Sequence, residues 1–113
     1  MILQIINDII NRNRICNWNE IDYNTANNML NENSKCVLLD VRSPQEFKEN
    51  NLKGSINIPF YDISKKIKNV IPIQETPIIV YCQTGSRSKK VINTLIKLGY
   101  NNLYNITGGM DNI

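Results

Sequence analysis

The 113-residue chain contains no histidine, and this absence removes imidazole from every mechanism that could be considered for it. A Cys–His or Ser–His catalytic pair cannot be built, and neither can a zinc site with histidine ligands. Only three cysteines are present, Cys16, Cys36 and Cys82, and their odd number and wide spacing argue against a paired disulfide framework and a CxxC metal knuckle. We therefore expect thiols in a reducing compartment such as the cytoplasm, with no metal and no cofactor.

Charge of either sign is also sparse. Thirteen Lys and Arg against ten Asp and Glu give a net charge of +3, and charged residues make up 20% of the chain. The basic residues are too scattered for a nucleic-acid footprint, apart from small clusters at 65–68 and 87–90. Hydrophobic residues make up 42%, which is typical of a globular protein and argues against disorder over most of the chain.

Residues 1–17 are predicted to form an N-terminal helix and linker before a single domain over residues 18–113. Apolar residues recur at nearly helical spacing between Met1 and Asn13, in a segment too short and too polar to span a bilayer. No basic region precedes them and no small-residue cleavage site follows, which argues against a signal peptide. We expect a short helix packed on the domain or on a partner, with contact at a membrane interface as the alternative.

Short apolar runs alternate with helical stretches from Trp18 onward. The apolar runs lie at 36–39, 55–58, 78–81 and 103–106, and the helical stretches at 25–30, 44–48, 63–70 and 88–98. Continuous apolar strands that are each followed by a helix predict a parallel sheet covered on both faces. The predicted fold class is therefore doubly wound α/β, in which ligands bind beyond the carboxyl ends of the strands.

The most convincing buried strand, residues 77–81, runs directly into Cys82 and a short loop. A loop that enters a helix N-terminus presents backbone N–H groups without intrahelical partners, and together with the helix dipole they favour an anion. Gly85 permits a positive φ, which turns successive N–H groups toward one centre, and Ser86 and Ser88 add hydroxyl groups. The loop is therefore predicted to cradle a negative charge.

Arg87 adds a fixed positive charge to this cradle, so we expect the pKa of Cys82 to fall below the value of about 8.5 of a free cysteine. The result would be a thiolate nucleophile that needs no histidine. The alternative is a small buried cysteine that ends a strand, with Gly85 merely making the turn. Cys16 and Cys36 have neither a glycine nor a helix start behind them, and we expect no catalytic role for either.

Five blocks of sequence follow one another in a fixed order. They are Leu38–Phe47 with its Asp-Val-Arg, Leu52–Pro59, Ile79–Arg87, Leu98–Leu103 and Gly108-Gly109. In order and spacing they resemble the signature segments of single-domain rhodaneses, a family of sulfurtransferases. The resemblance covers the chain from about Trp18 to Gly109.

This resemblance implies a three-layer rhodanese-like domain with a central parallel five-stranded sheet and helices on both faces. It also implies a persulfide mechanism, in which Cys82 takes sulfur from a small anionic donor such as thiosulfate and passes it to a thiol, cyanide or a protein acceptor. Asp40 and Arg42 correspond to a supporting pair, the first hydrogen bonding near the active loop and the second ion pairing. The residues expected to bind the donor are Gln83, Thr84, Gly85, Ser86 and Arg87.

Two other functions remain as alternatives. A non-catalytic rhodanese-like binding or regulatory module is usually marked by loss of the cysteine, and Cys82 is present. Related phosphatases and arsenate reductases place five residues between cysteine and arginine, a wider loop sized for a tetrahedral oxyanion. Here four residues separate Cys82 from Arg87, and Ser88 stands where the phosphatase arginine would be. This spacing favours sulfur over phosphate.

The chain departs from the family pattern at two places. Asn51 stands where the family often has histidine, which we expect to affect the entrance of the site rather than its chemistry. The tryptophan usually found a few residues after the double glycine is absent, and Ile113 falls at that position. We therefore expect a shortened last helix and a C-terminal edge that is less stable or is covered by the N-terminal helix.

Overall fold

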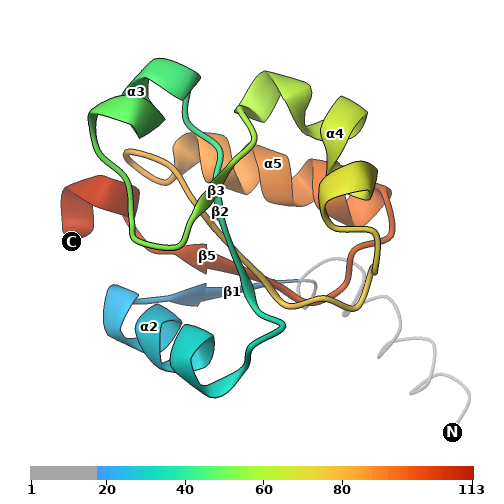
Figure 1. The fold of residues 1–113 in the computed structure, drawn as a ribbon, viewed down its shortest axis with the longest axis horizontal. Coiled ribbons are helices and arrows are strands. Elements are labelled where there is room, and N and C mark those ends of the chain that lie inside the picture. The colour runs from blue at the N-terminus through green and yellow to red at the C-terminus, as the bar shows by residue number, and fades with distance from the viewer. Residues whose placement is uncertain (1–17) are drawn as a thin grey trace, which may run out of the picture.

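The secondary structure is given by a computed structural model that describes residues 18–113 (Figure 1). The predicted N-terminal helix and Cys16 lie outside the described residues. The strands are β1 (Trp18–Ile21), β2 (Val37–Asp40), β3 (Ile56–Asn57), β4 (Ile78–Tyr81) and β5 (Leu103–Ile106). The helices are α2 (Tyr23–Glu32), α3 (Pro44–Glu49), α4 (Ile63–Val70) and α5 (Ser86–Lys97), with 3₁₀ turns η1 (Phe60–Asp62) and η2 (Gly109–Asn112). Among these helices of residues 18–113, none has the length and apolar character needed to cross a bilayer.

The strands form one sheet in the order β1-β5-β4-β2-β3, and every neighbouring pair is parallel. The predicted doubly wound parallel fold is therefore confirmed. β4 lies at the centre and all four of its residues are buried, as its unbroken apolar run predicts. β1 was missed among the apolar runs because this edge strand exposes Asn19 and Glu20 and buries little.

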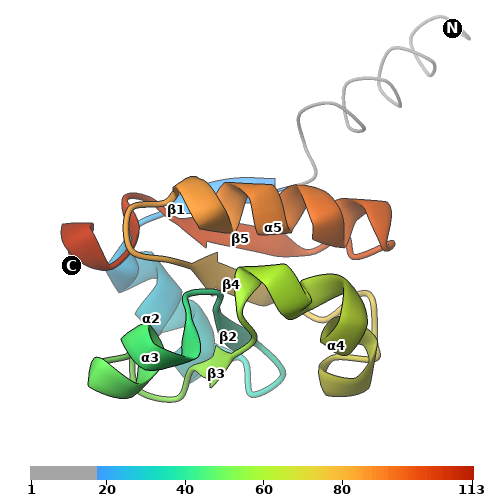
Figure 2. The same ribbon diagram turned by 90° about the horizontal axis from the view of Figure 1, so that it is seen from above.

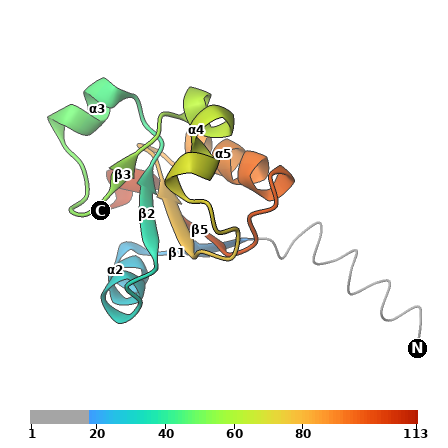
Figure 3. The same ribbon diagram turned by 45° about the vertical axis from the view of Figure 1, so that its right-hand side comes forward.

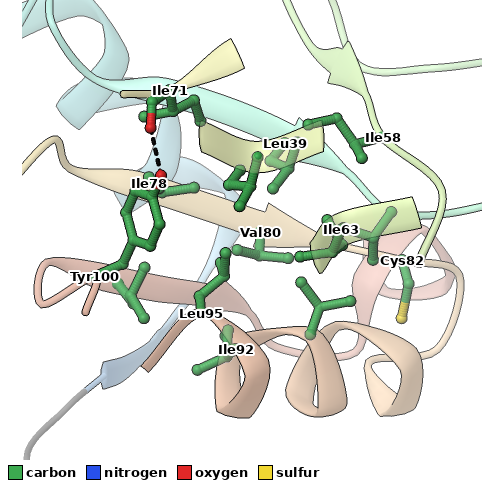
Figure 4. Close-up of a cluster of buried hydrophobic side chains, with 14 residues drawn as sticks. Leu39, Ile58, Ile63, Ile71, Ile78, Val80, Cys82, Ile92, Leu95 and Tyr100 are labelled. Atoms are coloured by element: carbon green, nitrogen blue, oxygen red, sulfur yellow. Dashed lines mark hydrogen bonds between the residues drawn. The ribbon is translucent and has the colours of Figure 1, made fainter. Parts of the chain in front are cut away.

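Helices cover both faces of the sheet, as predicted. Figure 3 shows α4 and α5 on one face and α2 on the other. Because side chains alternate along a strand, Ile78 and Val80 of β4 pack toward α4 and α5, whereas Ile79 and Tyr81 pack toward α2. Figure 4 shows the larger cluster, in which the Tyr100 hydroxyl also donates to the Ile71 carbonyl at 2.5 Å.

Three segments meet at the end of the molecule where the central strands terminate. Figures 1 and 2 show α3, the loop between β4 and α5, and the C-terminal turn η2 gathered on the same side. The helix α3 is short, but a capping box fixes its start: Ser43 Oγ accepts from Glu46 N, and the Glu46 carboxylate accepts from Ser43 N. The topology thus brings this helix next to the loop that carries Cys82.

Candidate active site

Cys82 follows β4 directly, and its sulfur is held by hydrogen-bond donors from the start of α5. The N–H groups of Gly85 and Ser88 lie 3.0 and 3.3 Å from Sγ, and the Ser88 hydroxyl oxygen lies 3.5 Å from it. Gly85 has φ +104°, the left-handed conformation that the loop sequence predicts. Figure 4 places Cys82 at the edge of the apolar cluster, and its thiol is 0% exposed. The buried sulfur therefore accepts from two backbone N–H groups, while its own S–H donates to Ser88 Oγ, whose hydroxyl donates to the Gly85 carbonyl at 3.0 Å.

These donors outweigh the effect of burial on the thiol. Burial raises the pKa of Cys82, whereas the hydroxyl of Ser88 and the backbone N–H groups of Ser88, Gly85 and Thr84 lower it. The net result is a pKa below the ordinary value, which is the direction expected from the loop. The site can therefore favour a thiolate without a histidine.

Arg87 is not an isolated positive charge. Its Nη1 and Nη2 lie 2.7 and 2.9 Å from the two carboxylate oxygens of Glu46 on α3, and its guanidinium carbon lies 5.7 Å from the centre of the Phe60 ring. The hydrogen bond from Arg87 is the main reason that the pKa of Glu46 falls to about 2. The positive charge expected at the loop is thus compensated by a carboxylate that the sequence reasoning missed.

Asp40 and Arg42 form a buried pair beside the loop. Arg42 Nη2 lies 2.8 Å from Asp40 Oδ2, and the two side chains are 1% and 0% exposed. Arg42 also donates to Asn50 Oδ1 at 3.3 Å, to the Asn50 carbonyl at 2.5 Å and to Gln83 Oε1 at 3.2 Å. The pair therefore joins the end of β2 to the end of α3 and to the active loop.

The remaining predicted loop residues differ in what their side chains touch. Gln83 is held at both ends, because it accepts from Arg42 and donates to Asp111 Oδ1 at 2.6 Å. The hydroxyls of Thr84 and Ser86 are exposed and lie 3.3 Å from each other. Neither has a hydrogen bond to Cys82, and Ser88 supplies the hydroxyl that lies near the sulfur.

The C-terminal turn η2 is hydrogen bonded to the first residues of the loop. The N–H groups of Met110 and Asp111 donate to the carbonyls of Cys82 and Gln83, each at 2.9 Å. Gly109 makes this approach possible, because a Cβ atom built on it would lie 2.2 Å from the Cys82 carbonyl oxygen. The Gly108-Gly109 block of the sequence therefore has a steric cause.

A family model described as Rhodanese-like domain matches residues 22–113. The chain belongs to this family. The matched residues begin at the N-cap of α2 and include Asp40, Arg42, the Cys82 loop and the turn η2. The resemblance carried by the five sequence blocks is therefore confirmed for the family and for its fold.

Relatives and solved structures agree with this assignment. An adenylyltransferase and sulfurtransferase UBA4 from Meyerozyma guilliermondii is 34% identical over 95 residues, which cover 79% of this chain and 21% of that protein. Thiosulfate sulfurtransferase PspE from Escherichia coli is 31% identical over 75 residues, covering 66% and 71%. A structure titled rhodanese with anions from E. coli matches with a TM-score of 0.64 at 29% identity, covering 69% and 91%. The chain thus spans about a fifth of the UBA4 relative's length and most of PspE's.

Cys36 is a half-buried free thiol beside β2, and burial raises its pKa, which is the opposite of the shift at Cys82. Over residues 18–113, no three side chains of His, Cys, Asp or Glu are grouped so as to hold a metal ion. Glu46 could have been suspected from the Ser43-Pro44-Gln45-Glu46 capping box, but nothing in the sequence pairs it with Arg87.

Proposed function

We propose that this rhodanese-like domain is a sulfurtransferase that carries a sulfane sulfur as a persulfide on Cys82. The observation that carries the proposal is the pair of backbone N–H groups, of Gly85 and Ser88, that donate to one buried sulfur, with the Ser88 hydroxyl oxygen 3.5 Å away. Such donors stabilise negative charge on sulfur, first as the thiolate and then as the persulfide. The names of the UBA4 and PspE relatives, both of which include sulfurtransferase, support this reading.

The proposed reaction has two balanced steps. The Cys82 thiolate attacks the outer sulfur of thiosulfate, a sulfur–sulfur bond forms to Cys82, and the bond to the leaving sulfite breaks with its electron pair. A nucleophilic acceptor such as cyanide then attacks the outer sulfur of the persulfide, leaves as thiocyanate, and restores the thiolate. Because Cys82 is 0% exposed, the loop must open locally to admit the donor.

Roles for the other residues follow from their positions. Gly85 and the backbone of Gln83, Thr84 and Ser86 would line the donor site, and Arg87 would attract an anionic donor. Asp40 and Arg42 would hold the loop in place and take no part in the chemistry. The acceptor would be a thiol, cyanide or a protein, and the free thiols of Cys36 and Cys82 fit a reducing compartment such as the cytoplasm.

Two observations argue against the other candidate functions. A non-catalytic module would have no need for a cysteine whose pKa is lowered by surrounding donors, as that of Cys82 is. A phosphatase or arsenate reductase would need an arginine one position later, where Ser88 lies buried against the sulfur. Assays of sulfur transfer and of phosphate ester hydrolysis distinguish both alternatives from a sulfurtransferase.

The test combines turnover with direct detection of the intermediate. Purified protein mixed with thiosulfate and cyanide is expected to release thiocyanate, and Cys82→Ser is expected to abolish this release. Cys36→Ser is the matched control, since it removes the other described free thiol and is expected to retain activity. Intact-mass measurement after thiosulfate alone should show the added mass of one sulfur atom, located on the peptide that contains Cys82.

Absence of turnover with several donors, together with no sulfur adduct on Cys82, would overturn the enzyme proposal and favour the binding module. Hydrolysis of p-nitrophenyl phosphate well above background would favour the phosphatase alternative instead. Sulfur adducts that persist in Cys82→Ser would show that another thiol is the carrier.

A further inference from the structure

An ion pair between Glu46 and Arg87 lies beside the Cys82 loop, and the proposed mechanism gives the Glu46 carboxylate no part. It joins α3 to the first turn of α5, and both side chains are about one-third exposed. Both carboxylate oxygens of Glu46 are engaged, at 2.7 and 2.9 Å from the two terminal nitrogens of Arg87. The pair is therefore bidentate, the geometry that fixes a guanidinium most firmly.

Glu46 is also held from its own side. Its Oε1 accepts from Ser43 N at 3.1 Å and its backbone N–H donates to Ser43 Oγ at 3.2 Å, so the carboxylate belongs to the capping box of α3. The carboxylate cannot swing away from Arg87 without loosening the start of this helix. An anion arriving at the loop would therefore meet Arg87 with the compensating negative charge still in place.

We propose that Glu46 sets the charge preference of the Cys82 site by compensating Arg87, and so weakens its attraction for dianionic donors relative to uncharged ones. The part that concerns donors rests on the proposed sulfurtransferase function. The charge effect itself does not, because it follows from the positions of the two side chains. Glu46 is thus a specificity-determining residue that acts through Arg87.

The physical reasoning is a comparison of two charge states. An Arg87 without a partner would present a full positive charge to a donor with two negative charges. The ion pair presents little more than a dipole, and Glu46 adds direct repulsion of the donor. An uncharged donor is insensitive to either effect. Removing the Glu46 charge should therefore change the ratio of anionic to neutral reactivity and leave the neutral rate nearly unaltered.

Glu46→Gln is the informative variant, because glutamine can still accept from Ser43 N and preserve the capping box. Glu49→Gln is the matched control: it removes one negative charge from the same helix, at an exposed side chain that accepts from Gln45 Nε2 at 3.5 Å. Cys82 is alkylated in each protein with iodoacetate and with iodoacetamide, which differ by one charge, and the labelled peptide is quantified by mass spectrometry. This readout requires no enzymatic activity.

At low salt the ratio of iodoacetate to iodoacetamide rates is expected to rise about three- to tenfold in Glu46→Gln and to stay unchanged in Glu49→Gln. At high salt the ratio of Glu46→Gln is expected to approach that of wild type, because ions screen the charge. The KM for thiosulfate should fall by at least this factor in Glu46→Gln, because thiosulfate carries two negative charges. An unchanged or lower ratio in this variant, or an equal rise in Glu49→Gln, overturns the proposal. Wild-type protein that never turns over thiosulfate overturns the proposed function alone, and the alkylation ratio still decides the role of Glu46.

Discussion

The carboxylate of Asp40 and the guanidinium of Arg42 form an ion pair that is excluded from solvent at the end of β2, with Nη2 and Oδ2 2.8 Å apart. Asp40 also accepts from the backbone N–H of Arg42 at 2.8 Å and from its Nε at 3.1 and 3.2 Å. The remaining guanidinium hydrogens go to Asn50 and Gln83, so all five donors of the side chain have acceptors. A buried charge with this many partners has a structural role, because it holds the end of β2, the end of α3 and the active loop together.

Asp40→Asn is expected to destabilise the fold by about 3 to 5 kcal/mol, because it leaves the Arg42 charge buried without a counter-charge. Urea denaturation at neutral pH measures this loss. Asp62→Asn is the control, since it removes the carboxylate of a partly exposed pair with Lys66 at 3.2 Å and should cost less than about 1 kcal/mol. Similar losses in the two variants would contradict the structural role assigned to the buried pair.

Ser88→Ala is expected to raise the pKa of Cys82, because the variant removes the hydroxyl that most strongly lowers it. The measurement is the rate of Cys82 alkylation by iodoacetamide as a function of pH. The midpoint of this curve gives the pKa of Cys82, because only the thiolate reacts. Ser86→Ala is the control, since its hydroxyl lies 3.3 Å from that of Thr84 and has no hydrogen bond to the sulfur. A midpoint shifted equally by both variants would show that the serine hydroxyls act only through the loop's general polarity.

The central part of the site could be predicted from the sequence because it is local. A buried apolar strand, a cysteine at its end and Gly85 before a helix lie within a few residues of one another. Gly85 as the N-cap starts α5 at Ser86, two residues earlier than the sequence indicated. Ser88 is thus the third helical residue and still lies in the first turn, where its N–H has no intrahelical partner and bonds the sulfur.

The rest depended on contacts between distant segments. Glu46 and Arg87 are 41 residues apart on different helices, and one sequence alone gives no sign that they meet. The edge strand β1 has no apolar run because it buries little, so the fifth strand was implied only by the family resemblance. The double glycine was recognised as a family block, but its approach to the Cys82 carbonyl is visible only in the folded chain.

The pair of Glu46 with Arg87 is expected to make stability depend on pH in the acid range. The hydrogen bond from Arg87, helped by those from Ser43, lowers the pKa of Glu46 from 4.5 to about 2. The contribution of the Glu46 carboxylate to stability is therefore fully present above 4.5 and is lost as the pH falls toward 2. After allowance for solvent screening of this partly exposed pair, the contribution is about 1 kcal/mol. Urea denaturation should show wild type more stable than Glu46→Gln at pH 6, with the gap closing between pH 4.5 and about 2. A gap that stays constant over this range would mean that the charge of Glu46 contributes nothing.

Gly109→Ala is expected to disrupt the loop as well as the fold. The added Cβ would lie 2.2 Å from the carbonyl oxygen of Cys82 and 2.8 Å from the backbone of Gln83, so either the turn η2 or the start of the loop must move. We expect a loss of about 3 kcal/mol or more, together with a change in the alkylation pH profile of Cys82, because η2 holds the backbone from which the sulfur projects.

Gly54→Ala separates steric contact from backbone strain. Gly54 has a similar positive φ, +83° against +61° for Gly109, but nothing lies within 4 Å of its added Cβ. This control should therefore lose only about 1 kcal/mol from strain and leave Cys82 reactivity unchanged. Equal losses in the two variants would mean that the fold requires the conformation of Gly109 rather than its close contact with Cys82. The packing of η2 against the active loop would then contribute nothing to stability.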